Sequence, residues 1–420
     1  MNILILGSGG REHALAETFL RFGHSVFCHP GNPGMLDCGS PLTDKQIPLD
    51  DFEALATEAK KKRIDLTVVG PELPLSLGIA DFFQKKGLAL FGPTKNAARL
   101  ESSKAWAKEF MLRHRIPTAR FAICSGASMA YKAAQDLFCQ GKQAVVKPSG
   151  LTGGKGVVCC DSMEEAEDAI AAASGYGEEI VIEELLRGPE LSLLALSDGT
   201  KAIPLLPAQD HKRLYDGGLG PNTGGIGAVA PVSFVNAAMM ERIEKEILQP
   251  TLAGLIEEGI DYRGVLYFGL MLTEEGPKVL EYNCRFGDPE TQAVMPLLDA
   301  DPAELMLDCL RGHLEPEKIR FLPLCACCVV LASSGYPEAP KTGIEIRGLE
   351  TLQGNPNVRV FYAGVAKDLD AKYVTSGGRV LGVTGLSPTL QGAVDTAYAS
   401  IKQLKVEGSH FRTDIGKEVC

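Results

Sequence analysis

Three polar residues alternate with apolar ones in a short segment of β-strand composition. Glu281, Asn283 and Arg285 occupy every second position, so in an extended strand their side chains share one face. A carboxylate and an amide oxygen two residues apart are hard ligands suited to Mg²⁺ or Mn²⁺, whose coordination is completed by water and nucleotide phosphates. An arginine one step further can neutralise developing negative charge. The segment predicts a metal-phosphate site, and the alternative is a strand whose polar face only meets water.

A glycine-rich loop between two strand-like segments is a second candidate phosphate site. Lys147 lies near the end of the first segment, at residues 144–148, and the second segment begins at residue 157. Amides of such a loop can close over triphosphate oxygens while Lys147 supplies a point charge beneath them. The spacing is not that of a Walker loop, and a mobile hairpin without a ligand remains the alternative. The loop residues concerned are Ser149, Gly150, Gly153, Gly154, Lys155 and Gly156.

The beginning of the chain contains a glycine turn that can bind an anion. An apolar strand at residues 3–6 runs into the sequence G-S-G-G, where Gly9 and Gly10 precede a predicted helix whose first amides form a phosphate cradle. A dinucleotide-binding motif would need a small residue in place of Glu12 and an acidic residue near Phe27, so NAD binding is disfavoured. A tight turn that binds no ligand is the structural alternative.

Composition narrows the class of protein. The chain has 420 residues, 45% of them hydrophobic and 23% charged, with a formal net charge of −11, which speaks against nucleic acid or an anionic membrane as the main partner. Its length suggests about three domains. The sequence has no apolar run long enough to predict a membrane span. Its first residues are typical of a strand and not of a signal peptide. The 12 cysteines lie mostly in apolar strands without histidines at zinc spacing, so we expect reduced thiols in a cytoplasmic protein.

The elements that must position these residues follow from the local patterns. Strand–turn–helix signals up to residue 101 predict a doubly wound parallel-sheet α/β domain. Lys104 follows two serines that open a helix ending near residue 114. A strand at residues 179–186 leads into a short linker suited to an adenine ring, and the polar segment 209–227 is predicted to be a long functional loop. Residues beyond about 319 predict a supporting α+β domain with no concentrated titratable groups, and with a helix at residues 387–404.

Six motifs, in order, carry a family resemblance over the whole chain. They are G-S-G-G-R-E-H-A at the start, V-G-P-E at 69–72, F-G-P-T at 91–94, Q-D-H-K-R at 209–213, G-P-N-T-G-G at 220–225 and E-Y-N-C-R-F-G-D-P-E at 281–290. Together they resemble the phosphoribosylamine-glycine ligases of the ATP-grasp superfamily, and the similarity extends to F-R-T-D-I-G at 411–416.

The resemblance implies an architecture and an activity. It implies an N-terminal α/β domain at residues 1–101, a central ATP-grasp region at 102–318 with a nucleotide lid at about 118–188, and a C-terminal α+β domain at 319–420. The implied enzyme is an ADP-forming ligase of purine biosynthesis that uses ATP and Mg²⁺ or Mn²⁺ to join glycine to 5-phosphoribosylamine. We expect a cytoplasmic monomer with these small-molecule substrates and with no nucleic-acid or membrane partner.

The resemblance also implies roles for matching residues. Glu281 and Asn283 match metal ligands, Gly9 and Gly10 match amides that receive the sugar phosphate, and the reacting groups meet at Arg285, Asp210 and Lys212. The positions that match the nucleotide site are Lys104, Lys147, Ser149, Gly150, Gly153, Gly154, Lys155, Gly156, Glu183, Glu184, Leu186 and Glu190.

Departures from the family pattern leave specific questions and two rival functions. Ser149 and Thr152 replace an acid and a small residue of the usual loop, the segment 174–178 is short, and Tyr267 stands on a strand where many relatives carry an acidic metal ligand. One rival is an ATP-grasp ligase with another acceptor, of the biotin carboxylase or peptide-forming kind. The other is a nucleotide-binding regulatory protein without turnover, against which the intact lysines and metal ligands argue.

Overall fold

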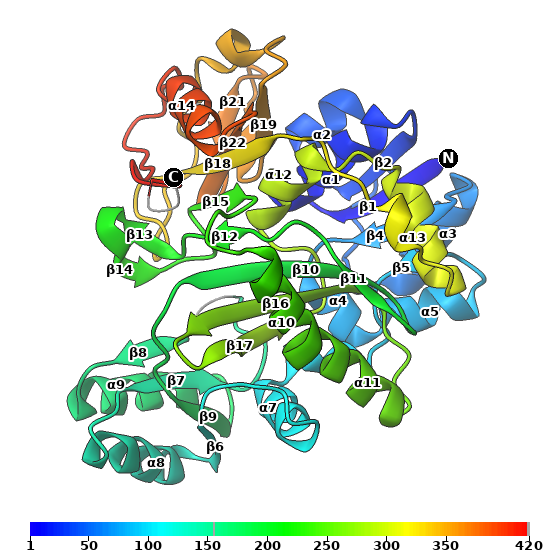
Figure 1. Ribbon diagram of the computed structural model, residues 1–420. Helices are drawn as coiled ribbons and strands as arrows, with labels where there is room; N and C mark the ends of the chain where they lie inside the picture. The colour runs from blue at the N-terminus through cyan, green and yellow to red at the C-terminus, as the bar shows by residue number, and fades with distance from the viewer. Residues whose placement is uncertain (154–155, 418–420) are drawn as a thin grey trace.

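The computed structural model describes residues 1–153 and 156–417, and Figure 1 shows the course of the chain. The described strands form several separate sheets. Among the described residues, no helix is both long and apolar enough to span a membrane.

The first part of the chain forms a parallel sheet with helices on both faces, as predicted. Its central strand is fully buried, with Ile3, Leu4, Ile5 and Leu6 at 0% exposure, because a strand between two helical layers has no solvent face. In the spatial order β3-β2-β1-β4-β5, the strands are Ser40–Pro41, Ser25–Pro30, Asn2–Gly7, Leu66–Val69 and Leu90–Phe91. The helices are α1 (Gly10–Arg21), α2 (Pro33–Cys38), α3 (Phe52–Lys61), α4 (Glu72–Leu77), α5 (Ile79–Lys85) and α6 (Arg99–Ser102).

The central sheet is antiparallel, and one of its edge strands contains Glu281 and Asn283 of the predicted alternating segment, with Arg285 two residues beyond the strand end. Strand β16 (Arg263–Thr273) pairs with β17 (Gly276–Asn283) and with β10 (Glu190–Asp198), whose other edge pairs with β11 (Ala202–Pro204). One continuous helical segment consists of α10 (Ala237–Ile243), a single π-helical turn η2 (Glu244–Leu248) and α11 (Gln249–Glu257). Helix α7 (Lys104–Arg113) begins after Ser103, whose side chain accepts a hydrogen bond from the Trp106 amide.

A smaller antiparallel sheet in the order β6-β9-β7-β8 packs against two helices and carries the glycine loop. In Figure 1 the central sheet lies between this sheet and the C-terminal sheet. Its elements are β6 (Phe121–Ser125), α8 (Ala127–Cys139), β7 (Ala144–Pro148), β8 (Val158–Cys160), α9 (Met163–Ser174) and β9 (Glu179–Glu184).

The C-terminal sheet includes two strands from the segment that we predicted to be a long loop. Strands β12 (Gln209–Asp210) and β15 (Gly227–Ala230) join β18 (Cys325–Ala332), β22 (Arg379–Ser387) and β19 (Val358–Tyr362) in the order β12-β15-β18-β22-β19. The loop prediction was wrong because residues 209–210, 213–215 and 219–222 form strands, and Ile226 near the end of the segment is fully buried. Between β12 and β15, β13 (Arg213–Tyr215) and β14 (Leu219–Asn222) form a separate hairpin.

The last helix begins later than predicted. Helix α14 (Leu390–Ile401) is capped by Thr389, because β22 continues to Ser387, where it pairs with Cys325. The remaining elements are β20 (Val365–Lys367), β21 (Tyr373–Thr375), α12 (Glu290–Val294), α13 (Pro302–Arg311) and the 3₁₀ turns η1 (Asp216–Gly218), η3 (Met295–Leu297), η4 (Pro316–Lys318) and η5 (Leu349–Leu352).

A buried carboxylate lies against the glycines at the first strand ends. Glu12 is 1% exposed, and its side chain fills the space where a Cβ of Gly7 or Gly70 would stand. A Cβ on Gly70 would come within 1.7 Å of the Glu12 Oε1, so only glycine leaves room for the carboxylate.

Replacing Gly70 by alanine should therefore destabilise the N-terminal domain. Overpacking of this kind costs about 1–3 kcal/mol, because the Glu12 carboxylate or the backbone must move. Urea unfolding followed by circular dichroism measures the change. Gly150→Ala is the matched control, since a Cβ there meets no atom within 4 Å. Equal stability of the two variants would show that Glu12 is free to move aside.

Candidate active site

A cavity of about 730 Å³ lies where the central sheet, the β6-β9-β7-β8 sheet and the C-terminal sheet approach one another. Most of the residues predicted from the sequence line it, and they come from segments that are far apart in the chain. The predicted residues in its wall are Lys104, Lys147, Gly153, Glu183, Glu184, Leu186, Glu190, Asp210, Lys212, Glu281, Asn283 and Arg285.

The predicted alternation on β17 is confirmed. Glu281, Asn283 and Arg285 are partly exposed and line the cavity, while Tyr282 and Cys284 are 2% and 1% exposed. One face of the segment therefore points into the cavity and the other into the core.

Glu281 is held in its charged form by the cations around it. Its carboxylate lies 3.7 Å from the Lys212 ammonium. Loss of solvent in the cavity would raise the pKa of Glu281, but Lys212, Lys147 and Lys104 outweigh that effect and lower the pKa to about 2. An ionised carboxylate and the Asn283 amide oxygen, which accepts a hydrogen bond of 3.2 Å from Arg285, form a two-ligand set. Among the described residues no cluster of three or more His, Cys, Asp or Glu is arranged for a metal, so this pair fits Mg²⁺ only with nucleotide phosphates and water as further ligands.

Arg285 is fixed by acidic residues that the sequence did not single out. Its guanidinium lies 3.2 Å from Glu101 and 3.9 Å from Glu72, the acid of the V-G-P-E motif. Glu101 also accepts a hydrogen bond of 2.7 Å from the Cys284 amide. Burial alone would lower the pKa of Arg285. The two carboxylates outweigh this effect, so the pKa is raised. The arginine is therefore a permanent and oriented cation.

Lys147 is paired with Glu183, and a second lysine shares the same carboxylate. Lys147 lies 2.9 Å and Lys108 lies 2.8 Å from the two Glu183 oxygens, and all three side chains are nearly inaccessible to solvent. Lys108 also donates to Thr118, whose hydroxyl donates to the carbonyl of Val279 on β17. Burial lowers the pKa of Lys108 to about 8, although Glu183 opposes the change. Glu183, predicted as part of the adenine-binding segment, thus binds two lysines through its side chain.

The glycine loop is attached to the start of α7. Lys104 donates to the carbonyl of Gly150 at 3.0 Å. Ser149, predicted to contact nucleotide, instead accepts a hydrogen bond of 3.1 Å from the Ala105 amide and is 6% exposed. Gly153 lines the cavity, whereas Gly156 is described but does not. Gly154 and Lys155 lie outside the described residues.

Beyond Glu183, the chain provides apolar walls and two carboxylates, Glu184 and Glu190, at the cavity. Leu185 and Leu186 line it together with Val145 and Met271, while the Glu184 carboxylate binds Lys142 and the Arg120 amide. Glu190 lies 3.2 Å from the Lys212 ammonium. The walls suit an aromatic ring, and the Glu190 carboxylate suits a hydroxyl-bearing group next to it.

Asp210 and Lys212 lie in the cavity wall together with Glu281. Burial and the nearby Glu290 raise the pKa of Asp210 well above its ordinary value. Glu190 and Glu281 overcome desolvation and raise the pKa of Lys212. Within the described part of the chain, Asp210 Oδ1 and both ring nitrogens of His211 are buried without a hydrogen-bond partner, which marks them as groups for a ligand or water to satisfy.

Tyr267, which stands where many ATP-grasp enzymes carry an acidic residue, contacts a carboxylate from another element. The Tyr267 hydroxyl donates to Glu290 at 2.8 Å, and the Ser192 hydroxyl donates to the same oxygen. Glu290 is 2% exposed and lines the cavity from α12.

The glycine turn of β1 lies beside the cavity and not in its wall. The Gly9 amide donates to the Glu12 carboxylate at 2.6 Å, and a Cβ on Gly10 would come within 2.7 Å of the Gln292 amide nitrogen. Arg11, next in the chain, does line the cavity. The sequence could not show that Glu12 folds back onto its own helix start, where the helix dipole and Arg11 favour a negative charge.

The C-terminal domain contributes two cations that the sequence reading missed. Arg379 and Arg412 line the cavity, so the expectation of a purely supporting domain was wrong. Arg379 lies 3.0 Å from Asp288 and donates to its carbonyl at 2.8 Å. Both arginines are far in sequence from the other site residues, so no local pattern linked them to the cavity. Arg412 does stand in the quoted motif at 411–416.

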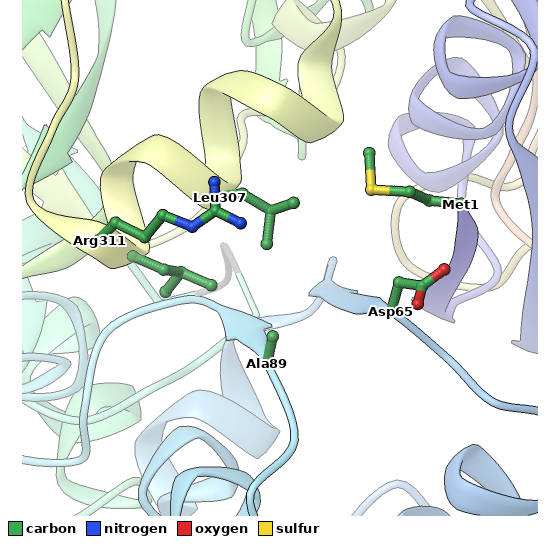
Figure 2. A pocket seen from close by; sticks show the side chains of 6 residues that line it. Met1, Asp65, Ala89, Leu307 and Arg311 are labelled. Atoms are coloured by element: carbon green, nitrogen blue, oxygen red, sulfur yellow. The ribbon is translucent and has the colours of Figure 1, made fainter.

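A second hollow, of about 450 Å³, lies between the N-terminal sheet and α13 and is mostly apolar. Figure 2 shows Asp65 and Arg311 on opposite sides of it, so its few charged groups do not converge. It offers no comparable set of chemical groups.

The fold is shared with solved biotin carboxylases. A solved biotin carboxylase domain of 2-oxoglutarate carboxylase from Hydrogenobacter thermophilus, in complex with MgADP, has the same fold with a TM-score of 0.74, 17% identity, and coverage of 98% of this chain and 91% of that chain. Family descriptions match residues 1–101, 102–291 and 326–418 as the N domain, the ATP-grasp (A) domain and the C domain of phosphoribosylglycinamide synthetase. The chain belongs to this family.

Full-length relatives agree with the family match. The phosphoribosylamine-glycine ligase of Synechocystis is 44% identical, with 99% of both chains covered. The crystal structure of the Thermotoga maritima ligase of the same name has 35% identity and a TM-score of 0.83, with 99% of this chain and 100% of that chain covered. A bovine trifunctional purine biosynthetic protein is 45% identical over 99% of this chain and 41% of its own length.

Replacing Lys108, which lines the cavity and is buried, by methionine should destabilise the protein strongly. The buried Glu183 would keep only Lys147 as a cationic partner, and breaking such a pair costs about 3–5 kcal/mol. Lys142→Met is the matched control, because its pair with Glu184 is partly exposed and worth under about 1 kcal/mol. Urea unfolding of both variants makes the comparison, and similar small losses would contradict a cooperative Lys108–Glu183–Lys147 cluster.

Proposed function

We infer that the chain is an ADP-forming ligase that joins glycine to 5-phosphoribosylamine, giving glycinamide ribonucleotide in purine biosynthesis. The observation that carries the proposal is the cavity in which Glu281 lies among Lys104, Lys147 and Lys212, within a chain that matches its ligase relatives from end to end. Those relatives favour this acceptor over that of the biotin carboxylases, whose similarity extends to the fold alone.

The nucleotide belongs between the small sheet and the central sheet. Leu185 and Leu186 face the adenine ring, Glu190 the ribose, and Lys104 and Lys147 the phosphates. Two lysines from different elements neutralise a triphosphate more precisely than a flexible surface patch, because their ammonium groups are already bound at fixed positions. The described glycines of the loop, Gly150, Gly153 and Gly156, belong on the lid side of these phosphates.

A divalent cation fits beside these phosphates. Glu281 and Asn283 provide two oxygen ligands from one strand face, and Mg²⁺ or Mn²⁺ bound there would neutralise phosphate charge. The protein also directs permanent positive charge at the same point through Arg285, so the phosphoryl group meets cations on more than one side.

The acceptor side lies toward the N-terminal domain. We place the sugar phosphate near Gly9 and Gly10, where Arg11 and Arg285 line the adjoining wall. Because the Gly9 amide is bound to Glu12, an anion can use that amide only after the Glu12 carboxylate releases it. Asp210 and Lys212 face the region in which the glycine carboxylate and the phosphates meet.

The reaction requires two transfers and no covalent bond to the enzyme. A glycine carboxylate oxygen attacks the γ-phosphorus of ATP and ADP leaves, which forms glycyl phosphate. The amine of phosphoribosylamine then attacks the carbonyl carbon, phosphate leaves with the bridging oxygen, and the amine nitrogen loses a proton. The residues of this chain position the reactants and neutralise charge, which are the main needs of phosphoryl and acyl transfer. The cytoplasmic location and the monomeric state remain predictions.

Substrate dependence tests the function directly. We expect sustained ADP release from the purified chain only when ATP, Mg²⁺, glycine and freshly prepared phosphoribosylamine are all present. Release that continues without glycine, or that responds to bicarbonate in its place, would assign the cavity to another acceptor. A chain that binds ATP without any turnover would be a regulatory protein.

Glu281→Gln should reduce turnover by roughly 100-fold at limiting Mg²⁺, since the amide keeps the shape but loses the charge that attracts the cation. Initial rates across a Mg²⁺ titration measure the effect. Glu275→Gln, on the exposed turn before the same strand, is the control and should match the parent. Parental rates for Glu281→Gln would move the metal site elsewhere.

A further inference from the structure

The C-terminal motif at residues 411–416 has no role in the proposed reaction, yet the structure draws it to the cavity. Arg412 is 3% exposed and lines the cavity wall. Its guanidinium binds both oxygens of Asp414 at 2.7 Å, a bidentate geometry that fixes the plane of both groups. Two residues from the far end of the chain thus form a rigid pair beside the nucleotide site.

Arg412, Thr413 and Asp414 hold the β13–β14 hairpin through its backbone and through the Asp216 side chain. Arg412 donates to the carbonyl of Arg213 at 3.2 Å, and Asp414 accepts from the Gly217 amide at 2.7 Å. The Thr413 amide donates to the Asp216 carboxylate at 2.8 Å, and the Thr413 hydroxyl donates to the same group. The contacts therefore reach both the incoming strand and the turn of the hairpin.

The hairpin in turn bears on the site. Arg213, Gly218 and Asn222 line the cavity, and the Asn222 side chain donates to the carbonyl of Val157, next to the glycine loop, at 3.5 Å. At its base, the Thr223 amide and hydroxyl both donate to the carbonyl of Lys212 at 2.8 Å. Any shift of the hairpin would move Lys212, whose ammonium bridges Glu190 and Glu281.

We propose that Arg412, Thr413 and Asp414 form a clamp that positions the β13–β14 hairpin, and through it Lys212, at the nucleotide site. Arg412 acts here as a positioning residue, and its effect on catalysis rests on the function proposed above for the cavity. Charge supports the arrangement: burial opposes ionisation of Asp414, but the Arg412 hydrogen bonds and the Gly217 amide lower its pKa to about 2. The clamp therefore stays ionised at neutral pH.

A double-mutant cycle tests whether Arg412 works through Lys212. Arg412→Met should lower kcat roughly 10-fold and weaken MgADP binding, as removal of a partner that orients a site residue commonly does. In a Lys212→Met background, Arg412→Met should lower kcat by less than about 2-fold. The fold-losses in kcat from two independent residues multiply in the double mutant, whereas those from two coupled residues do not. Arg412→Lys, which keeps the charge but loses the bidentate geometry, should fall between parent and Arg412→Met. Arg347→Met removes an exposed ion pair with Glu345 in the same domain and should leave kcat unchanged.

Limited trypsin digestion tests the clamp without any substrate. Cleavage after Lys212 or Arg213 should be faster in Arg412→Met and in the milder Thr413→Val, which loses one hydroxyl contact, than in Arg347→Met. Thermal unfolding checks that each variant is folded. If Arg412→Met does not fold, Thr413→Val takes its place in the digestion test. Unchanged cleavage, or multiplicative losses of kcat in the cycle, would overturn the clamp. If the parent chain shows no ligase turnover, the proposed function fails while the cleavage comparison still decides whether the clamp exists.

Discussion

The charge balance around Glu281 is the constraint on which the site depends. One carboxylate on β17 stays ionised because Lys212, Lys147 and Lys104 surround it, and each of those lysines reaches the cavity from a different element. In a medium of low polarity an isolated charge of either sign would be costly, so the acids and bases must arrive together. We propose that a magnesium nucleotide uses the same groups, because its charges can replace part of this internal pairing.

Charged residues of the site come from three different sheets, at the places where these sheets face the cavity, and not from their buried cores. Lys147 and Glu183 come from the small sheet, Glu281 from the central sheet, and Asp210 from β12 of the C-terminal sheet. Strands β12 and β15 pair within the C-terminal sheet, so the segment that carries Asp210 and Lys212 is attached to that sheet. The site is therefore complete only when all three sheets are packed as observed, and a change in any one of them alters the balance around Glu281.

Local sequence patterns predicted the parts of the site that one element determines. The alternation of Glu281, Asn283 and Arg285 placed three side chains in the cavity, and the serine before Lys104 marked the start of α7. Partners from distant segments left no such signal: Glu101 for Arg285, Lys108 for Glu183, and Arg412 for the β13–β14 hairpin. Ser149 and Gly9 were read as ligand groups, but nearby helix starts and carboxylates compete for the same hydrogen bonds. Both differences arise because polar groups near a helix N-terminus have protein partners close at hand.

Transfer of oxygen from the glycine carboxylate to phosphate tests most directly whether the cavity activates a carboxylate by phosphorylation. Glycine labelled with ¹⁸O in its carboxylate is turned over with MgATP and phosphoribosylamine, and the released phosphate is examined by mass spectrometry. Formation of glycyl phosphate leaves the bridging oxygen with phosphorus, so one ¹⁸O should appear in each phosphate formed. Unlabelled phosphate during product formation would contradict the account.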